Sequence, residues 1–438
     1  MSAQLETGTR WRNWGRSQDV TPQHVARPET VDEVVAVVNA ARLRGLTVKA
    51  IGASHSFTGI AATRGVQVDV SRLDGVYAVD GTRVTLGAGT NLYQLPALLD
   101  PLGLALTNMG DIDRQTIAGA TSTGTHGTGA AFGGLATQVV ALTLVTAAGE
   151  ILHVSETENA ELLPAARLGL GALGIVVEIT IECVPSFALR AVEKPEPLAD
   201  VLDDWMARSG GVDHFEFYWF PHTETALTKS NTRMPADTPA VRQSAMASWV
   251  DDELLTNGVF AVTCGLGKLM PGIIPGINNL ADKLVAEREI TDVSHRIFVA
   301  PRRVRFREME YAIPRENVPE ALRAIQKLVA DKGWNISFPV EVRVAAADDN
   351  WLSTAYGRES GYIAVHRYYR EDPTEYFEAV EAIMKGFGGR PHWGKMNYRD
   401  AESLAAVYPR FDDFRAVRDR LDPARLFANE YLDRVLGR

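Results

Sequence analysis

The feature that most constrains the fold of this sequence is a twenty-residue stretch, 110–129, built mainly from small residues. It contains five glycines, five threonines and one serine. Backbone N–H groups and small hydroxyls are therefore presented with little side-chain bulk, and N–H groups in tight glycine-rich turns hold phosphate oxygens. The spacing matches neither a P-loop nor the GxGxxG fingerprint. The stretch indicates an anion site of another kind, and a glycine-rich surface loop is the alternative.

A second small-residue loop, Gly-Ala-Ser-His-Ser-Phe at 52–57, follows a short predicted strand at 47–51. A strand that ends in such a loop offers further backbone donors. His55 could cap the loop, bind a metal or become joined covalently to a cofactor. No cluster of His, Cys, Asp or Glu with metal-ligand spacing supports the second option, so we expect no metal site.

Bulk properties exclude several classes of protein. A chain of 438 residues exceeds the usual size of a single core, so two or three packed units are expected. The net charge of −10 argues against a nucleic-acid or anionic-membrane partner. No stretch reaches the roughly 18 apolar residues of a membrane span, and the N-terminus lacks a signal-peptide pattern. Cys183 and Cys264 lie in apolar surroundings typical of buried thiols. These features predict a cytoplasmic protein.

Strand and helix patterns alternate up to Pro185, which favours an α/β or α+β domain carrying the two small-residue loops. Residues 31–43 keep helical spacing after Thr30, a credible N-cap. Beyond residue 186 aromatic residues gather, and the alternating run 214–221 is typical of a sheet that faces both a core and a cavity. We expect 232–269 to be irregular.

Charged residues in the second half point to chemistry. Glu341 and Arg343 lie two apart in an apolar strand, so both side chains share one face. They could offer an acceptor and a donor to a sugar hydroxyl, or form a salt bridge on a solvated face. Lys395 follows aromatic bulk and could act as a base or as a donor to a reactive ring, or simply end a helix.

Several motifs together, in order along the chain, resemble those of one family. They are the segments 52–57 and 110–129, Leu-Gly-Ala-Leu-Gly at 170–174, Glu-Val-Arg at 341–343, His-Trp-Gly-Lys at 392–395, Leu-Asp-Pro at 421–423 and Phe-Ala-Asn at 427–429. The family is the aldonolactone oxidoreductases, within the vanillyl-alcohol-oxidase-type flavoproteins. The resemblance runs from about residue 10 to the C-terminus.

The resemblance implies an α+β fold of two domains. It assigns 1–185 to an FAD-binding domain and 186–388 to a cap domain with a large antiparallel sheet, with 389–438 returning to the FAD domain. FAD itself would explain the small residues, because its pyrophosphate takes backbone N–H groups and its flat ring needs close backbone approach.

By position in the motifs, the resemblance also implies the cofactor contacts. His55 stands where the family joins a histidine to the 8α-methyl group of FAD, so we predict covalent attachment. The implied FAD contacts are Ala53, Ser54, His55, Ser56, Phe57, Gly110, Thr116, Gly119, Ala120, Ser122, Thr123, Gly124, His126, Gly127, Gly174, Ile175 and Lys395.

The implied reaction oxidises the C2 secondary alcohol of a sugar 1,4-lactone, such as L-gulono-1,4-lactone, to an ascorbate-type product. Hydride goes to flavin N5 while a base takes the hydroxyl proton. Glu341, Arg343 and Lys395 would be the catalytic residues, and Asp111, Glu341, Arg343 and His366 would bind substrate. Arg343 itself is a poor base, because a guanidinium keeps its proton in proteins.

The electron acceptor and the exact substrate stay open. Gly110 occupies the position that guards the flavin C4a edge, and its missing Cβ favours an oxidase that uses O2 and releases hydrogen peroxide. A lactone dehydrogenase with another acceptor is the alternative. Alditol oxidases share most motifs, but His366 and Asp111 replace their small hydroxylic residue and serine. A binding module without turnover is the remaining class, and the sequence does not indicate the oligomeric state.

Overall fold

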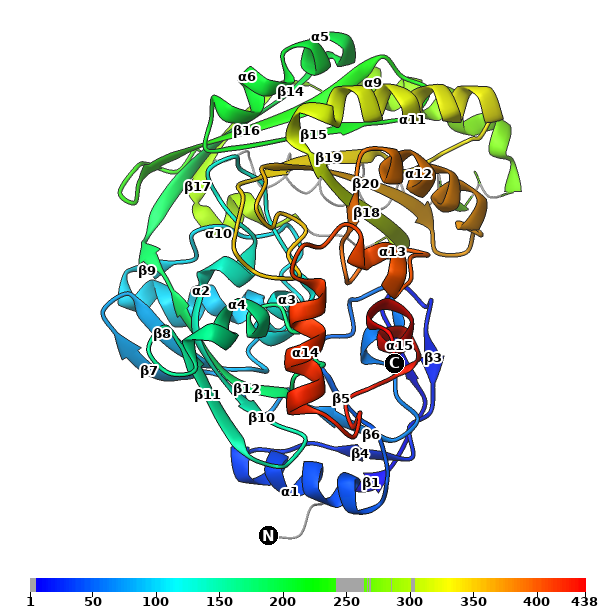
Figure 1. The fold of residues 1–438 in the computed structure, drawn as a ribbon. Helices are drawn as coiled ribbons and strands as arrows, with labels where there is room; N and C mark the ends of the chain where they lie inside the picture. Colours follow the sequence, from blue (N-terminus) through cyan, green and yellow to red (C-terminus); the bar gives the residue numbers. More distant parts are fainter. Residues whose placement is uncertain (1–4, 242–263, 266, 268, 285, 301–303) are drawn as a thin grey trace.

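The computed structural model describes residues 5–241, 264–265, 267, 269–284, 286–300 and 304–438. In Figure 1 the N-terminal sheets form the lower part, a large sheet with its helices forms the upper part, and C-terminal helices lie at the side between them. Strands and helices are thus segregated into layers, which is the α+β arrangement that the sequence predicts.

The N-terminal part contains two sheets. The first has the order β1 (Glu6–Thr7), β4 (His24–Ala26), β6 (Val66–Asp69) and β5 (Val48–Ile51), with β4, β6 and β5 parallel. The second is antiparallel, in the order β11 (Ile151–Ser155), β10 (Val139–Val145), β12 (Ile175–Glu182), β8 (Arg83–Gly87) and β7 (Val76–Asp80). Two separate pairs of short strands complete the N-terminal part. They are β2 (Trp11–Arg12) with β3 (Asp19–Val20), and β9 (Leu104–Ala105) with β13 (Val184–Pro185).

Helix α1 (Val31–Leu43) covers the first sheet. The Thr30 side chain accepts a hydrogen bond from the Glu33 N–H and caps the helix, as its sequence predicts. The apolar stripe of Val34, Val38 and Ala41 then packs into one cluster with residues of β5 and β6. The other helices of this part are short: α2 (Leu95–Leu99), α3 (Ile117–Thr123) and α4 (Leu163–Ala166).

Helix α3 lies within the glycine-rich stretch, where we expected only a loop. Thr116 caps it by accepting from the Gly119 N–H, and Gly124 ends it with a φ of +83°. Only glycine adopts that left-handed conformation without strain. Small residues therefore serve here to end a helix as well as to expose backbone groups.

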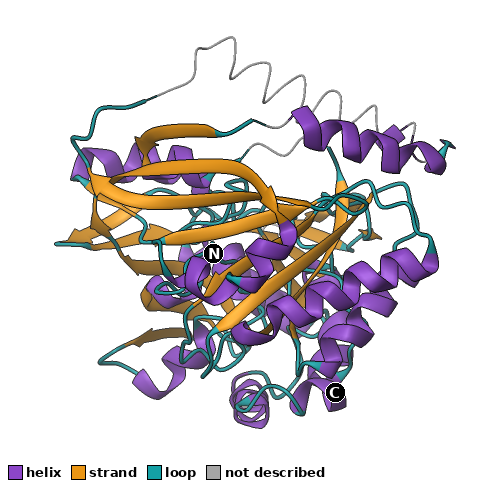
Figure 2. Ribbon diagram, turned by 90° about the horizontal axis from the view of Figure 1, so that it is seen from above, coloured by secondary structure: helices purple, strands orange, loops and turns teal. Residues whose placement is uncertain are grey.

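The large sheet is antiparallel and eight-stranded. Its order is β17 (Arg288–Val293), β14 (Phe187–Pro197), β16 (Thr225–Pro235), β15 (His214–Trp219), β19 (Val340–Ala345), β20 (Ser360–Tyr368), β18 (Phe306–Pro314) and β21 (Arg390–Pro391). Figure 2 shows its long strands crossing the molecule with helices packed beside them.

The two faces of this sheet differ in chemistry because side chains alternate along each strand. One face buries apolar residues, including Phe217, Val342 and Tyr311, under α5 (Leu198–Asp203), α6 (Trp205–Gly210), α11 (Val318–Lys332) and α12 (Thr374–Gly386). The opposite face carries Glu216, Arg343 and Glu310, all buried. The prediction of a strand at 214–221 with two different faces is confirmed.

The C-terminal segment connects both parts. It contains α13 (Ala401–Ala405), α14 (Phe411–Leu421) and α15 (Glu430–Leu436). After α14, the buried Asp422 carboxylate accepts from the N–H groups of Leu426 at 2.7 Å and Phe427 at 2.8 Å. Leu426 then accepts from the Val48 N–H of β5, which attaches this segment to the first sheet.

Several expectations can be compared with the structure. β21 lies inside 389–438 but pairs with β18, so that range does not return as a whole to the first sheets. The boundaries 1–185, 186–388 and 389–438 otherwise stay predictions. The expected irregularity of 232–269 is wrong at its start, where β16 continues to Pro235, and 242–263 lies outside the described residues. Helices α9 (Ile274–Leu284) and α10 (Ser294–Phe298) follow. Cys183 and Cys264 are free and buried, as expected.

Replacing Asp422 tests how the C-terminal segment is held. In Asp422→Ala two buried N–H groups lose a charged acceptor worth about 1.5–3 kcal/mol each. We expect the midpoint of thermal unfolding to fall by roughly 3–8 °C, measured by calorimetry. Asp412→Ala, at an 84% exposed side chain, is the control and should leave the midpoint within about 1 °C. Equal effects of the two substitutions would contradict this account.

Candidate active site

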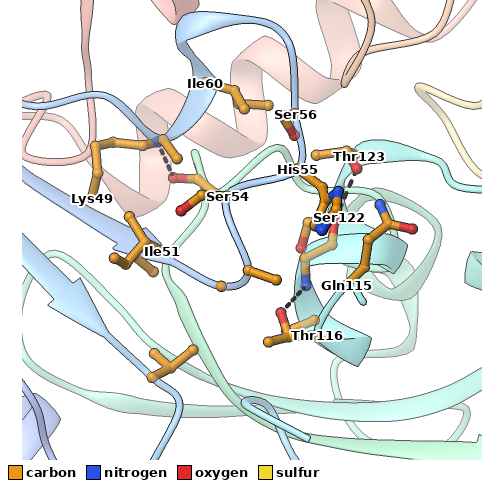
Figure 3. Close-up of a pocket in the computed structure, with 18 of the residues that line it drawn as sticks. Lys49, Ile51, Ser54, His55, Ser56, Ile60, Gln115, Thr116, Ser122 and Thr123 are labelled. Atoms are coloured by element: carbon orange, nitrogen blue, oxygen red, sulfur yellow. Dashed lines mark hydrogen bonds between the residues drawn. The ribbon is translucent and has the colours of Figure 1, made fainter. Parts of the chain in front are cut away.

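A cleft opens between β5, the loop 52–57, helix α3 and the 170–174 segment, and it contains about 860 Å³ of space outside the protein atoms. Figure 3 shows the loop that carries Ser54, His55 and Ser56 passing close to the helix that carries Ser122 and Thr123. This contact depends on glycine, because a Cβ at Gly52 would lie 2.2 Å from Oγ1 of Thr116.

The loop presents unused backbone donors to this cleft. The carbonyl oxygens of Ser54 and Ser56 accept from the Trp14 N–H and the Asn13 side chain, at 2.8 Å each. In contrast, the N–H groups of 53–56 donate to no other residue in the described part of the chain. Ser54 has a φ of +60°, the left-handed conformation found where backbone N–H groups converge on an anion. The donor set therefore fits the pyrophosphate of a dinucleotide such as FAD.

His55 lines the same cleft, and its ring stacks on Trp14 with the centroids 5.6 Å apart. Burial lowers the pKa of His55 to about 4, and the positive charges of Lys395 and Arg114 add to the effect. The imidazole is therefore neutral at pH 7, and one ring nitrogen has a free lone pair. A neutral imidazole is the form that can act as a nucleophile.

A group of buried charges, which we name the arginine cluster, surrounds Arg343. Its Nη2 lies 3.2 Å from Oδ1 of Asp111 and also pairs with Glu341, and its Nε donates to Glu216 at 3.0 Å. Glu216 lies 3.7 Å from Nζ of Lys229 on the next strand. Burial opposes the charge of Arg343, but the surrounding carboxylates outweigh it and raise the pKa of its guanidinium. Glu341 and Arg343 thus form no solvated salt bridge, because both are at least nine-tenths buried.

A second group, the lysine cluster, lies on β18 and the residues facing it. Nζ of Lys395 pairs with Glu308, and Nε2 of His366 lies 3.6 Å from the same carboxylate. Burial alone would raise the pKa of Glu308, but Lys395 and His366 lower it to about 2. Burial likewise opposes the charge of Lys395, yet Glu308 and Glu310 raise its pKa. Lys395 is therefore an ammonium ion here, does not end a helix, and lies over the ring of Phe57.

His126, Glu310 and His392 complete the lysine cluster, with ligand-type atoms within 4.8 Å of one another. His126 donates from Nδ1 to the Gly127 carbonyl at 2.8 Å, and its Nε2 lies 3.3 Å from Glu310. Nδ1 of His392 accepts from the Gly394 N–H. Burial alone would raise the pKa of Glu310, but the interaction with His126 outweighs burial and lowers that pKa. This arrangement is explained by hydrogen bonds and an ion pair, and the expectation of no metal stays a prediction.

The predicted cofactor contacts separate into two sets. Those that line the cleft are Ala53, Ser54, His55, Ser56, Thr116, Gly119, Ser122, Thr123 and Gly174. The remaining ones lie elsewhere. Ala120 and Ile175 are core residues, Gly124 ends α3, and Phe57 packs against Phe306. Gly110, His126, Gly127 and Lys395 lie outside the lining of this cleft. Their contacts with FAD stay predictions.

The predicted substrate residues also separate. Asp111, Glu341 and Arg343 come together in the arginine cluster, whereas His366 belongs to the lysine cluster and donates from Nδ1 to the Pro339 carbonyl. Sequence reasoning missed Glu216, Glu308 and Glu310. The signal was present, because Glu308 and Glu310 lie two apart in an apolar strand, as Glu341 and Arg343 do. Lys49, a cleft residue that donates to Gly171 and Phe427 carbonyls, was also missed.

The cleft and the two clusters are typical of an FAD-dependent oxidoreductase. Comparison with known proteins supports this class. A model of the FAD binding domain matches residues 22–155. A second model, D-arabinono-1,4-lactone oxidase, matches residues 179–435, more than half of the chain. The chain belongs to this aldonolactone oxidase family, and the predicted resemblance is confirmed.

Curated relatives span nearly the whole chain. The L-gulono-1,4-lactone dehydrogenase of Mycobacterium tuberculosis is 43% identical over 98% of this chain and 99% of its own. The L-gulonolactone oxidase of Bos taurus is 36% identical over 98% of each chain. Among solved structures, a variant of cholesterol oxidase from Brevibacterium sterolicum has a TM-score of 0.81 at 18% identity, covering 99% of this chain and 98% of that one. The last comparison supports the fold alone, and the predicted fold class is confirmed.

Two buried histidines predict how stability depends on pH. Burial lowers the pKa of His214 to about 4 and that of His392 to about 3, against about 6.5 in an unfolded chain. Between pH 7 and 4 the unfolded chain therefore binds more protons, so stability falls as the pH falls. We expect the unfolding midpoint to drop steadily from pH 7 to 5 in calorimetry. His214→Gln should reduce that slope, and a midpoint independent of pH would contradict neutral burial.

Proposed function

We propose that this protein oxidises the C2 secondary alcohol of a sugar 1,4-lactone. The observation that carries the proposal is the buried Glu341–Arg343 pair beside Asp111, in a chain with an FAD-binding domain. A carboxylate and a guanidinium fixed on one strand face offer both an acceptor and donors to adjacent hydroxyls. The names of the relatives support a lactone as substrate.

In this proposal the arginine cluster binds and orients the substrate, so that C2–H points at the flavin. Bound FAD supplies the hydride acceptor at N5. Glu341 accepts the hydrogen bond and then the proton of the C2 hydroxyl, because Arg343 and Lys395 both keep their protons. The substrate thus loses one hydride and one proton and becomes the 2-keto lactone, an ascorbate-type product.

Lys395 has an electrostatic role in this proposal. Its raised pKa makes it a poor base, which argues against the deprotonating role that the sequence left open. Its ammonium group, held by Glu308, instead stabilises negative charge that develops beside it during oxidation.

We also propose that His55 forms the covalent bond to FAD. The residue lines the cleft, and its lowered pKa keeps a ring nitrogen available for bond formation at pH 7. The stacking on Trp14 restricts the orientation of the ring.

For the electron acceptor we propose O2, with release of hydrogen peroxide. The supporting feature is Gly110, which has no side chain; a Cβ there would lie 3.0 Å from the His126 carbonyl oxygen. The second candidate is a lactone dehydrogenase, favoured by the name of the relative that is 43% identical. An alditol oxidase is disfavoured because Asp111 is engaged by Arg343 and His366 by Glu308.

The cellular setting belongs to the same proposal. Among the described residues, no helix is both long and apolar enough to cross a membrane. We propose a cytoplasmic enzyme without a nucleic-acid partner, from the acidic net charge and the two free buried thiols. Fractionation of cells that express the tagged chain would test the location.

Anaerobic flavin reduction tests the substrate and the acceptor. We expect L-gulono-1,4-lactone to bleach the flavin absorption band of the purified yellow protein, and the colour to return rapidly when air is admitted. Slow return would make the protein a dehydrogenase, and bleaching by xylitol alone would make it an alditol oxidase. Lys395→Met should slow the reduction by about 10²-fold or more, without a comparable change in lactone affinity. Unchanged reduction in this variant would exclude the proposed role.

Acid precipitation tests the covalent bond. We expect the FAD of the wild-type protein to precipitate with the chain, and the intact mass to exceed that of the polypeptide by one FAD less two hydrogen atoms, because the new N–C bond replaces an N–H and a C–H bond. His55→Ala should release all FAD into the supernatant, because the linking nitrogen is gone. Ser56→Ala is the control and should retain the bond. Free FAD from the wild-type protein would refute attachment at His55.

A further inference from the structure

A small chamber lies beside the arginine cluster and has no assigned role. It is lined by Met109, Asp111, Gly127, Thr128, Glu216, Lys229, Asn231, Phe298 and Arg343, and it contains about 230 Å³ of space outside the protein atoms. The free space is narrow, so it admits one small polar group rather than a sugar ring. Because Asp111 and Arg343 belong to both, the chamber adjoins the place proposed for the C2 hydroxyl.

Asn231 is the residue that most needs an explanation. Its side chain is only 2% exposed, and its Oδ1 accepts no hydrogen bond from any residue in the described part of the chain. A buried amide oxygen without a donor costs free energy, so such an atom in a cavity wall indicates a ligand or an ordered water. The chamber thus contains an acceptor that requires an O–H or N–H donor.

Lys229 supplies the complementary donor. It lies two residues before Asn231 on β16, so both side chains leave the strand on the same face. Its Nζ donates to the Ile297 carbonyl at 3.0 Å and lies 3.7 Å from Glu216. An ammonium has three N–H donors. A hydroxyl, which both donates and accepts, matches the pair of Asn231 and Lys229, whereas a methyl group or a carboxylate does not.

We propose that the chamber binds a hydroxyl of the exocyclic arm of the lactone, with Asn231 and Lys229 as the residues that determine specificity for that arm. The inference rests on the proposed function, because it places the C2 hydroxyl at Glu341 and Arg343. The ring then spans from the arginine cluster to the chamber entrance.

The test compares lactones with and without the arm. D-arabinono-1,4-lactone carries a hydroxymethyl arm, and L-threono-1,4-lactone is a four-carbon lactone without one. We expect Asn231→Leu to lower kcat/KM for the first by about 10-fold to 100-fold, as in sites that lose a hydrogen bond to a substrate hydroxyl. The same variant should leave kcat/KM for the four-carbon lactone within about twofold. Lys229→Met also removes a charged neighbour of Glu216, so it should lower kcat/KM for both lactones, and by a larger factor for the lactone with the arm.

A matched control separates specificity from structure. Asn350 is also buried, with amide atoms that lack a partner in the described part of the chain, but it lines neither the cleft nor the chamber. Asn350→Leu should change kcat/KM for both lactones by the same factor. If Asn231→Leu also lowers kcat/KM for both lactones equally, or lowers it for neither, the chamber does not bind the arm. Should Asn231→Leu fail to fold, Asn231→Ser decides the question by the same comparison.

Binding of a lactone that cannot be oxidised at C2 distinguishes this proposal from the proposed function. 2-Deoxy-D-ribono-1,4-lactone keeps the hydroxymethyl arm and lacks the C2 hydroxyl. We expect its Kd, measured by calorimetry on the FAD-containing protein, to rise at least fivefold in Asn231→Leu. If no lactone reduces the flavin but this shift is observed, the proposed reaction fails and the chamber stands. An unchanged Kd, or no binding to the wild-type protein, overturns the chamber.

Discussion

The burial of a charged sheet face is the constraint on which the rest of this structure depends. One face of the eight-stranded sheet is an ordinary apolar core, while the other carries carboxylates, the Arg343 guanidinium and the Lys229 ammonium, all with side chains at least four-fifths buried. Such burial is costly unless each charge has a partner in good geometry. Cross-strand contacts satisfy this requirement, because Glu216 lies opposite Lys229 in the ladder and accepts a hydrogen bond from Arg343 on the other neighbouring strand. Charges held in this way stay oriented before any substrate arrives.

Two kinds of close contact join the two small-residue segments of the N-terminal part to the rest of the structure. Glycine allows the first: the loop 52–57 touches helix α3 because Gly52 has no Cβ, and the loop leaves the N–H groups of 53–56 to the cleft. Hydrogen bonds make the second. Phe57 N–H donates to the Gly394 carbonyl and Gly129 N–H to Val344, which connect the two small-residue segments to the C-terminal segment and to β19. The loop 52–57, the glycine-rich stretch and the charged sheet face are therefore held together by backbone contacts.

Family membership and site geometry agree on the class of chemistry, which is FAD-dependent oxidation. The buried charges decide which side chains keep their protons. The lysine cluster keeps Lys395 protonated through Glu308, and the arginine cluster fixes Arg343 with three carboxylates. In the proposed reaction a carboxylate is therefore the proton acceptor, and both cations bind substrate or stabilise negative charge. His55 differs from both groups, because burial and the positive charges of Lys395 and Arg114 lower its pKa to about 4 and keep it neutral.

The sequence by itself determined the family, the presence of an FAD-binding domain and the shared face of Glu341 and Arg343, since ordered motifs and strand alternation are local properties. It also indicated the strands that became β5, β15 and β19, and the α1 cap. Only the tertiary structure decided that α3 forms inside the glycine-rich stretch, that Glu216 meets Arg343, and that Glu308 holds Lys395, 87 residues away. Pairing across a sheet depends on register and strand order, which join residues far apart in the chain, so no local pattern contains it. The Asn231 oxygen, which accepts from no residue in the described part of the chain, is likewise a property of the packed cavity alone.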